Sequence, residues 1–187
     1  MTHDALEIAR NFLTVPRRTL HKVGDFELCD LDYRQVCLWA EQFSVTPDGV
    51  VKMLAEMTAD EEVLTILENY DEYRFTVEDG HIKSLRWYFY ETPEHVFKML
   101  DGMLLERLCL YGCVEVDLFR SKEVNIRLQN LKKLFCARCE IKRLNLSFMS
   151  QLTVFRCEEN QLTELDLSAV PQLTVLGCGD NQPCLYS

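Results

Sequence analysis

The chain is poor in glycine, proline and histidine, with 7, 5 and 4 residues among 187. So few glycines leave little room for a phosphate-binding loop, and the scattered histidines have no serine or cysteine nucleophile motif near them. No apolar stretch approaches the ~18 residues that a membrane-spanning helix needs, and the first residues lack the basic and apolar regions of a signal peptide. We therefore expect a cytoplasmic protein with no catalytic residues, no cofactor and no membrane segment.

The negative charge is concentrated in the first part of the chain. Residues 1–81 carry 17 acidic and 7 basic side chains, whereas residues 82–187 carry 13 of each, so the whole net charge of −10 lies before residue 82. An acidic segment repels polyanions, and we therefore do not expect it to attract nucleic acid.

The nine cysteines are an odd number and lack the spacing of a disulfide framework. Cys136-x-x-Cys139 has the spacing of a zinc ligand pair, and Cys109 and Cys113 lie a short distance before it. A zinc site needs four converging ligands, whereas the repeat described next already accounts for Cys136. We expect reduced cysteines that pack as small hydrophobic side chains, and no metal site.

The C-terminal third of the chain repeats one pattern with a period of 21 residues. Apolar side chains recur at its first, fourth and sixth positions, and cysteine or asparagine recurs at the ninth. It reads Leu131-x-x-Leu134-x-Cys136-x-x-Cys139, Leu152-x-x-Phe155-x-Cys157-x-x-Asn160 and Leu173-x-x-Leu176-x-Cys178-x-x-Asn181. The pattern resembles the leucine-rich repeat family, most closely the short bacterial 21-residue type.

This resemblance implies stacked coils with a parallel sheet on the concave side, because one coil cannot bury its own apolar residues. It also implies that Asn160 and Asn181 turn inward and hydrogen-bond backbone groups of the bend, and that Cys139 takes this position in an earlier coil. The template extends less regularly to two earlier units, which gives strand starts near 82, 105, 131, 152 and 173. A helix from Pro93 to Met99 would return the chain on the convex side.

The residues before the repeats are expected to form a helical cap. Apolar side chains at helical spacing predict helices at 4–14, 32–43 and 60–67, and Thr46-Pro47 predicts the start of another. The segment around Gly24 is expected to be irregular.

A β-hairpin is expected between this cap and the repeats. Apolar alternation from Tyr73 to Val77, followed by Asp79-Gly80, predicts a strand and a tight turn before the strand of the first unit. The expected fold class is α+β: an acidic helical cap at 1–70, then the hairpin and a short leucine-rich-repeat solenoid at 71–187 with a parallel β-sheet on its concave face.

The third, fifth and seventh positions of each repeat would point outward from the concave face. They carry basic and aromatic side chains and one acid: Arg86, Tyr88, Arg107, Tyr111, Lys133, Phe135, Arg156 and Glu158. Arginine and tyrosine are enriched at binding hot spots. We expect this face to bind a protein partner through an acidic or aromatic-rich segment. The alternative is a solvated face with incidental cation–π pairs.

Two further alternatives remain open. Residues 36–54 resemble the helix-turn-helix of bacterial DNA-binding domains, although Ser44 stands where its turn usually has glycine. Lys52 is the one base of the second helix, whereas a DNA reader needs several. The other alternative is self-assembly: the last unit ends just past its strand, so its edge would pair with a second copy to form a homodimer, unless Pro183 and the tail fold over it.

Overall fold

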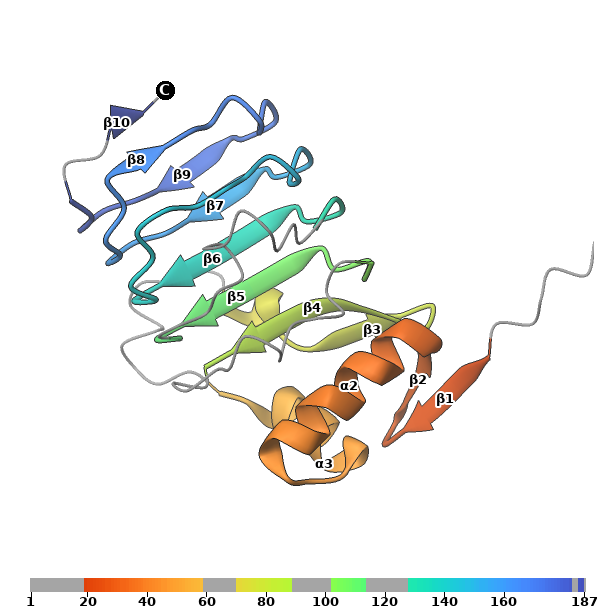
Figure 1. The fold of residues 1–187 in the computed structure, drawn as a ribbon. Coiled ribbons are helices and arrows are strands. Elements are labelled where there is room, and N and C mark those ends of the chain that lie inside the picture. The colour runs from red at the N-terminus through yellow and green to blue at the C-terminus, as the bar shows by residue number, and fades with distance from the viewer. Residues whose placement is uncertain (1–18, 59–69, 89–101, 114–127, 183–184, 187) are drawn as a thin grey trace, which may run out of the picture.

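The computed structural model describes residues 19–58, 70–88, 102–113, 128–182 and 185–186. Within these residues the chain forms β1 (Leu20–Val23), β2 (Phe26–Cys29), α2 (Asp30–Phe43), α3 (Pro47–Glu56), the 3-10 helix η1 (Tyr70–Tyr73), β3 (Thr76–Glu78), β4 (His81–Trp87), β5 (Arg107–Tyr111), β6 (Lys133–Ala137), β7 (Val154–Arg156), β8 (Glu164–Leu165), β9 (Val175–Gly177) and β10 (Leu185–Tyr186). The fold is mixed α+β, as the sequence predicts (Figure 1). The expected helices at 4–14, at 60–67 and from Pro93 to Met99 lie outside the described residues.

A six-stranded sheet in the order β3-β4-β5-β6-β7-β9 forms the body of the described structure. Only the β3–β4 pair is antiparallel, and its turn at Asp79 and Gly80, with φ of 52° and 79°, is the predicted hairpin turn. The other strands pair in parallel with no shift in register. One row across the sheet joins Leu85, Leu108, Leu134, Phe155 and Leu176. The predicted phase of the five units is therefore confirmed.

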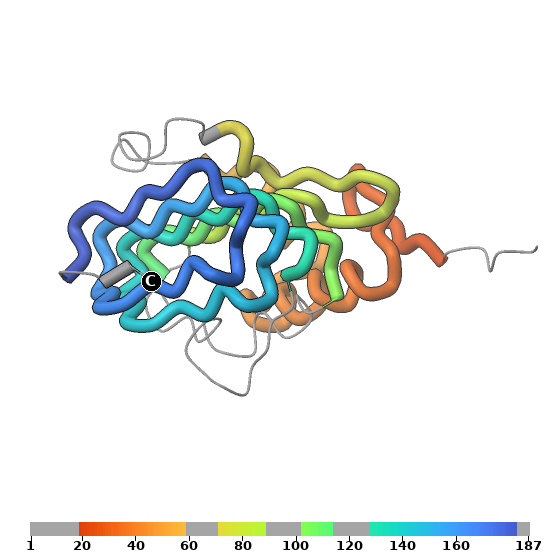
Figure 2. The backbone as a smooth tube through the Cα atoms, turned by 90° about the horizontal axis from the view of Figure 1, so that it is seen from above, coloured from red at the N-terminus to blue at the C-terminus, as the bar shows by residue number. Residues whose placement is uncertain are grey.

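The bends after four parallel strands share one left-handed residue, although the bend after β6 has a second at Glu140. The shared residue has φ of 61° at Gly112, 53° at Arg138, 52° at Glu159 and 53° at Asp180. The next residue points inward and donates a hydrogen bond to a carbonyl of the preceding strand or of the residue just beyond it. The donor and acceptor pairs are Cys113 with Trp87, Asn160 with Cys136, and Asn181 with Cys157, whereas the Cys139 thiol lies 3.7 Å from the Leu110 carbonyl and nearer that of Ala137. Figure 2 shows the result, in which successive turns of the chain overlie one another.

Asn160 makes the most complete set of these contacts. Its Oδ1 accepts hydrogen bonds from the backbone N–H groups of Cys139 (3.0 Å) and Ile141 (3.1 Å). Its Nδ2 donates to the carbonyls of Cys136 (2.7 Å) and Cys157 (3.0 Å). These contacts confirm the inward orientation predicted for Asn160, and the hydrogen bonds of Asn181 confirm it for that residue.

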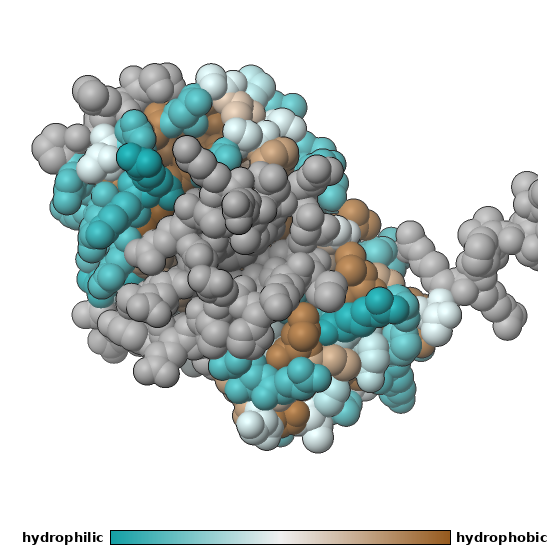
Figure 3. All heavy atoms as spheres, in the orientation of Figure 1, coloured by the Kyte–Doolittle hydropathy of each residue, from teal (hydrophilic) through white to brown (hydrophobic). Residues whose placement is uncertain are grey.

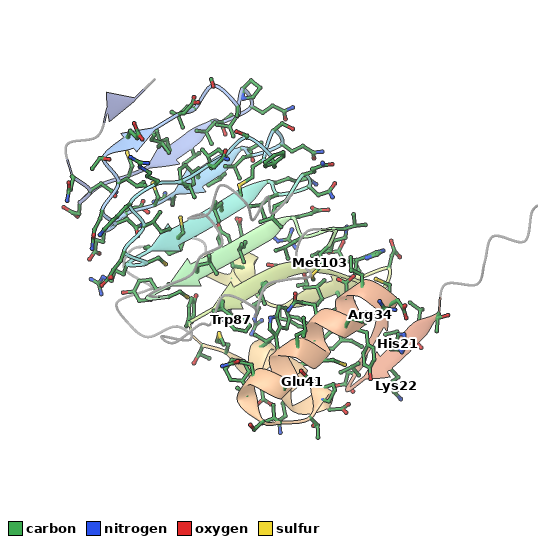
Figure 4. All side chains as sticks on the ribbon, viewed as in Figure 1. His21, Lys22, Arg34, Glu41, Trp87 and Met103 are labelled. Carbon is green, nitrogen blue, oxygen red and sulfur yellow. The ribbon has the colours of Figure 1, made fainter. Side chains whose placement is uncertain are left out.

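Helices α2 and α3 pack at the N-terminal end of the sheet (Figure 1). Trp87 of β4 lies beside the helices (Figure 4). Its ring centroid is 5.3 Å from that of Trp39 of α2, and both side chains are fully buried. The predicted start of α3 is confirmed, because Thr46 Oγ1 accepts the backbone N–H of Gly49 at 3.1 Å and Pro47 is the first helical residue. The segment expected to be irregular instead forms the β1–β2 hairpin.

The chain continues in register beyond β9. Strand β10 pairs in parallel with β8, and Leu185 and Tyr186 align with Glu164 and Leu165 across the same 21-residue step. The sequence led us to expect an end just past β9, whereas residues 185–186 pair with β8. Pro183 lies outside the described residues. No helix in the described parts of the chain is long and apolar enough to span a membrane.

Candidate functional site

The predicted binding face is the side of the sheet opposite the main core. In β5, Leu108 and Leu110 point into the main core, whereas Cys109 and Tyr111 belong to a second hydrophobic cluster on the other side. Side chains at equivalent register positions of the other strands share that side. We call it the outer face.

Helix η1 covers part of the outer face. Tyr73 of η1 is 2% exposed and packs in the second hydrophobic cluster, which also contains Cys109, Tyr111, Phe135 and Ala137. Ser84 of β4 also ties the sheet to η1, because its hydroxyl donates to the carbonyl of Glu72 at 3.2 Å. Burial raises the pKa of the Tyr73 phenol above its usual value. The first strands of the sheet are therefore sandwiched between the main core and η1.

Because η1 covers part of the outer face, this face is less exposed than the sequence led us to expect. Arg86 is 2% exposed and Phe135 is fully buried, and Arg86 Nη2 donates to the carbonyl of Met57 at 2.6 Å. Tyr111 is also buried, with Arg138 Nη1 donating to its hydroxyl at 2.6 Å and the guanidinium 5.6 Å from its ring centre. Tyr88 is half-buried and meets the Tyr111 ring edge-on. Arg86, Tyr111 and Phe135 thus contact other parts of the protein in this structure.

Arg107 and Lys133 line a cavity of about 350 Å³ where the sheet meets η1. Its other lining residues are Asp71, Glu72, Thr76 and Lys132. Lys133 Nζ pairs with the Glu72 carboxylate, and Arg107 Nη2 donates to Thr76 Oγ1 at 3.4 Å. The cavity therefore mixes three basic with two acidic side chains, and the ion pair to η1 already neutralises part of the positive charge.

The last two strands of the sheet, β7 and β9, leave more of the outer face accessible. Val175 of β9 is 40% exposed, and Arg156 of β7 retains 25% of its side-chain surface. Arg156 Nη1 lies 3.5 Å from Glu158 Oε1. Glu158 lies over the backbone of Gly177, where an added Cβ would come within 2.2 Å of the same carboxylate oxygen. Glycine at 177 thus makes room for Glu158.

The cysteines considered as zinc ligands instead donate to backbone carbonyls. Cys113 Sγ lies 3.3 Å from the Trp87 oxygen, and Cys139 Sγ lies 3.1 Å from that of Ala137. Cys136 donates to the Arg156 carbonyl at 3.7 Å. Burial raises the pKa of the Cys136 thiol well above its usual value and that of Cys109 to about 12. Neutral, hydrogen-bonded thiols in these positions fit the structural role predicted for them.

The helix pair that resembles a DNA-binding unit is present, with Ser44 in the left-handed conformation (φ 53°) at the end of α2. Helix α3 buries Val50, Val51 and Leu54 and offers Lys52 as its one basic residue. These contacts add no support for the alternative in which the helix pair binds DNA.

One cluster of reactive side chains was not anticipated from the sequence. Cys29, Asp32 and His81 place a thiol, a carboxylate oxygen and a ring nitrogen within 4.8 Å of one another. Burial, together with the hydrogen bond to Asp32, raises the pKa of the Cys29 thiol, so it is not an activated nucleophile. No local spacing could reveal this cluster, because His81 is about 50 positions from the other two residues.

Comparisons with known proteins bear on neither the fold nor the site. No family model, curated protein or solved structure matches the chain. The function is therefore argued from the geometry of the chain itself.

Proposed function

We propose that the protein is a non-catalytic protein-binding module of the leucine-rich-repeat type, whose partner lies against the outer face of the sheet. The in-register parallel strands and the inward-pointing side chain after each of four strands support the repeat assignment. The observation that carries the binding role is the accessible surface of β7 and β9, where Val175 and Arg156 lie on neighbouring strands outside the second hydrophobic cluster.

The chemistry of this surface favours an extended partner segment with both apolar and acidic side chains. Val154 and Val175 are neighbours across the β7–β9 pair and supply the apolar contact. On binding, Arg156 would leave its ion pair with Glu158 and pair with a carboxylate of the partner. Because one ion pair replaces another, the net gain in binding free energy is limited. Arg107 and Lys133 would extend the basic surface toward the cavity under η1.

A pull-down with matched variants tests this proposal. Arg86 is unsuitable for charge reversal because it is buried, so the test pair is Val175→Glu and Arg156→Glu. The control is Arg143→Glu, since Arg143 is 78% exposed and pairs with Glu164 away from the outer face. We expect partners recovered with the unmodified protein and with Arg143→Glu to be lost with the test pair. The same set of partners for all variants would refute binding through β7 and β9.

The two alternatives predict different outcomes. A DNA-binding protein would shift a duplex at low salt, and Lys52→Glu would abolish the shift; an unaffected duplex removes this alternative. A self-assembling unit would sediment as a dimer through the exposed Val175 and Leu176 of β9, and Leu176→Lys would return it to a monomer.

We also propose that the protein resides in a reducing compartment. All eight cysteines within the described residues are free thiols, and five of them are buried. Free buried cysteines are typical of proteins kept under reducing conditions.

A further inference from the structure

Three segments of the chain converge beside the first turn of α2. Cys29 is the last residue of β2, Asp32 lies in the first turn of α2, and His81 follows the Asp79–Gly80 turn as the first residue of β4. Two hydrogen bonds fix these segments to one another. The backbone N–H of Cys29 donates to the carbonyl of Gly80 at 2.8 Å, and the backbone N–H of Ile82 donates to Asp32 Oδ1 at 2.7 Å. The three side chains are therefore held together by the backbone, not only by their own contacts.

Three potential ligand atoms form a small triangle at this point. Cys29 Sγ lies 2.7 Å from Asp32 Oδ2 and 3.3 Å from His81 Nδ1, and Nδ1 lies 3.2 Å from Oδ2. Zinc bonds of about 2.0–2.3 Å in a tetrahedral site place neighbouring ligand atoms roughly 3.3–3.6 Å apart. Two sides of the triangle are already near this range, and the Sγ–Oδ2 side needs to open by less than about 1 Å.

We propose that Cys29, Asp32 and His81 bind a divalent transition metal ion of the zinc class, with a fourth position open to solvent. Thiolate, imidazole and carboxylate are the ligand types that zinc takes in proteins, and three protein ligands leave one position for water. The thiol gives its proton to solvent when the sulfur coordinates, so the thiolate and the carboxylate together balance the two positive charges of the ion.

The surroundings suit such an ion. Asp32 is fully buried, and a buried carboxylate is stabilised by a nearby cation. The backbone N–H of Ile82 donates to the other carboxylate oxygen of Asp32 and so fixes the orientation of the ligating oxygen. Hydrogen bonds of this kind orient ligand side chains in metal sites. His81 retains 14% of its side-chain surface and Cys29 is only half-buried, so an ion can reach the site from solvent.

Cobalt substitution tests the ligand set directly. We expect the reduced protein to bind one equivalent of Co²⁺ with thiolate charge-transfer and tetrahedral ligand-field absorption, and Zn²⁺ to displace it. Cys29→Ser, His81→Gln and Asp32→Asn should each weaken cobalt binding at least tenfold. Asp32→Asn keeps an oxygen that can accept from Ile82, so it removes the anionic ligand with little change to the fold. Cys178→Ser, at a half-buried cysteine outside the cluster, is the matched control and should bind as the unmodified protein does.

A second measurement needs no variant and so does not depend on folding of the substituted chains. Alkylation of native protein, followed by peptide mass spectrometry, should show Cys29 modified at least tenfold more slowly with Zn²⁺ than without it. Cys37, which is also half-buried, should react at the same rate in both samples. An unchanged rate at Cys29, or a cobalt spectrum that persists in Cys29→Ser, would overturn the proposal and leave the cluster as a hydrogen-bonded link between hairpin and helix.

Discussion

Replacing Asn160 by leucine should destabilise the protein strongly, because one side chain serves several buried backbone groups. Leucine has the same branched arrangement of side-chain heavy atoms but neither accepts nor donates a hydrogen bond. The substitution leaves the N–H groups of Cys139 and Ile141 without an acceptor, and Asn160 is only 7% exposed. Each buried unsatisfied group costs about 1–3 kcal/mol, so the two together cost about 2–6 kcal/mol. We expect a loss of about 4 kcal/mol in the free energy of unfolding, within the typical stability of a domain of about 5–15 kcal/mol.

The equivalent position one step along the chain provides the control. Asn181 Oδ1 accepts from the N–H of Leu162 at 3.1 Å, and its amide is only partly buried. With one N–H lost and water able to replace it, Asn181→Leu should cost about 1 kcal/mol. Urea unfolding followed by circular dichroism gives both values from the shift in midpoint at constant m-value.

A third variant separates hydrogen bonding from packing. Asn160→Asp keeps the acceptor but turns an anionic oxygen toward the carbonyls of Cys136 and Cys157. It should therefore be as damaging as leucine at pH 7 and less so at pH 4, where the protonated carboxyl can donate. A loss below about 0.5 kcal/mol for Asn160→Leu, or a larger loss at Asn181, would refute this account of the bend.

Three further predictions concern single contacts. Glu106 pairs with Lys132 at 2.8 Å and Lys83 at 3.5 Å, and the hydrogen bond from Lys132 is the main cause of its lowered pKa. Because the folded pKa lies below the unfolded one, the carboxylate stabilises the protein at neutral pH, and this contribution is lost as pH falls through the folded pKa. Glu106→Gln should therefore cost about 0.5 kcal/mol at pH 7 and less at pH 3, as measured by urea unfolding; an equal cost at both values would contradict the ion-pair assignment. The pKa of Cys109 is about 12, so iodoacetamide at pH 8 should modify Cys178 first in native protein and both cysteines equally in urea, as read by peptide mass spectrometry. Thr46→Ala removes the cap on Gly49 and should cost about 1 kcal/mol in thermal unfolding, whereas Thr46→Ser should cost little.

The periodic part of the chain was predictable because its local pattern and its tertiary contacts agree. Each leucine row is set by the spacing of apolar residues, and the strands pair along those rows. Thr46-Pro47 and Asp79-Gly80 were predictable for a different reason, since cap and turn chemistry is local. The short β1–β2 hairpin was missed because each of its four-residue strands buries only one side chain, Val23 or Leu28, which is too little for a periodic signal.

The candidate sites depend on contacts between distant segments and were only partly predictable. Alternation along the strands correctly placed Arg156 and Lys133 on the face opposite the main core. It could not show that Tyr73 joins the hydrophobic cluster that contains Phe135, because nothing in the local pattern of η1 specifies which surface it covers. The approach of His81 to Cys29 likewise results from folding of a hairpin against a helix.

The repeated register step between strands has a consequence for the length of this protein. Thr153 contacts Lys132 through the same hydroxyl-to-carbonyl bond that Thr174 makes to Thr153, at 3.0 and 2.9 Å. The segment 152–172 therefore makes the same contact with the segment before it as the segment after it makes with 152–172. Duplicating that segment would place a second Arg156 at the register position where Gly177 now makes room for Glu158, so lengthening the protein by a whole unit also requires a smaller residue at one of these two positions.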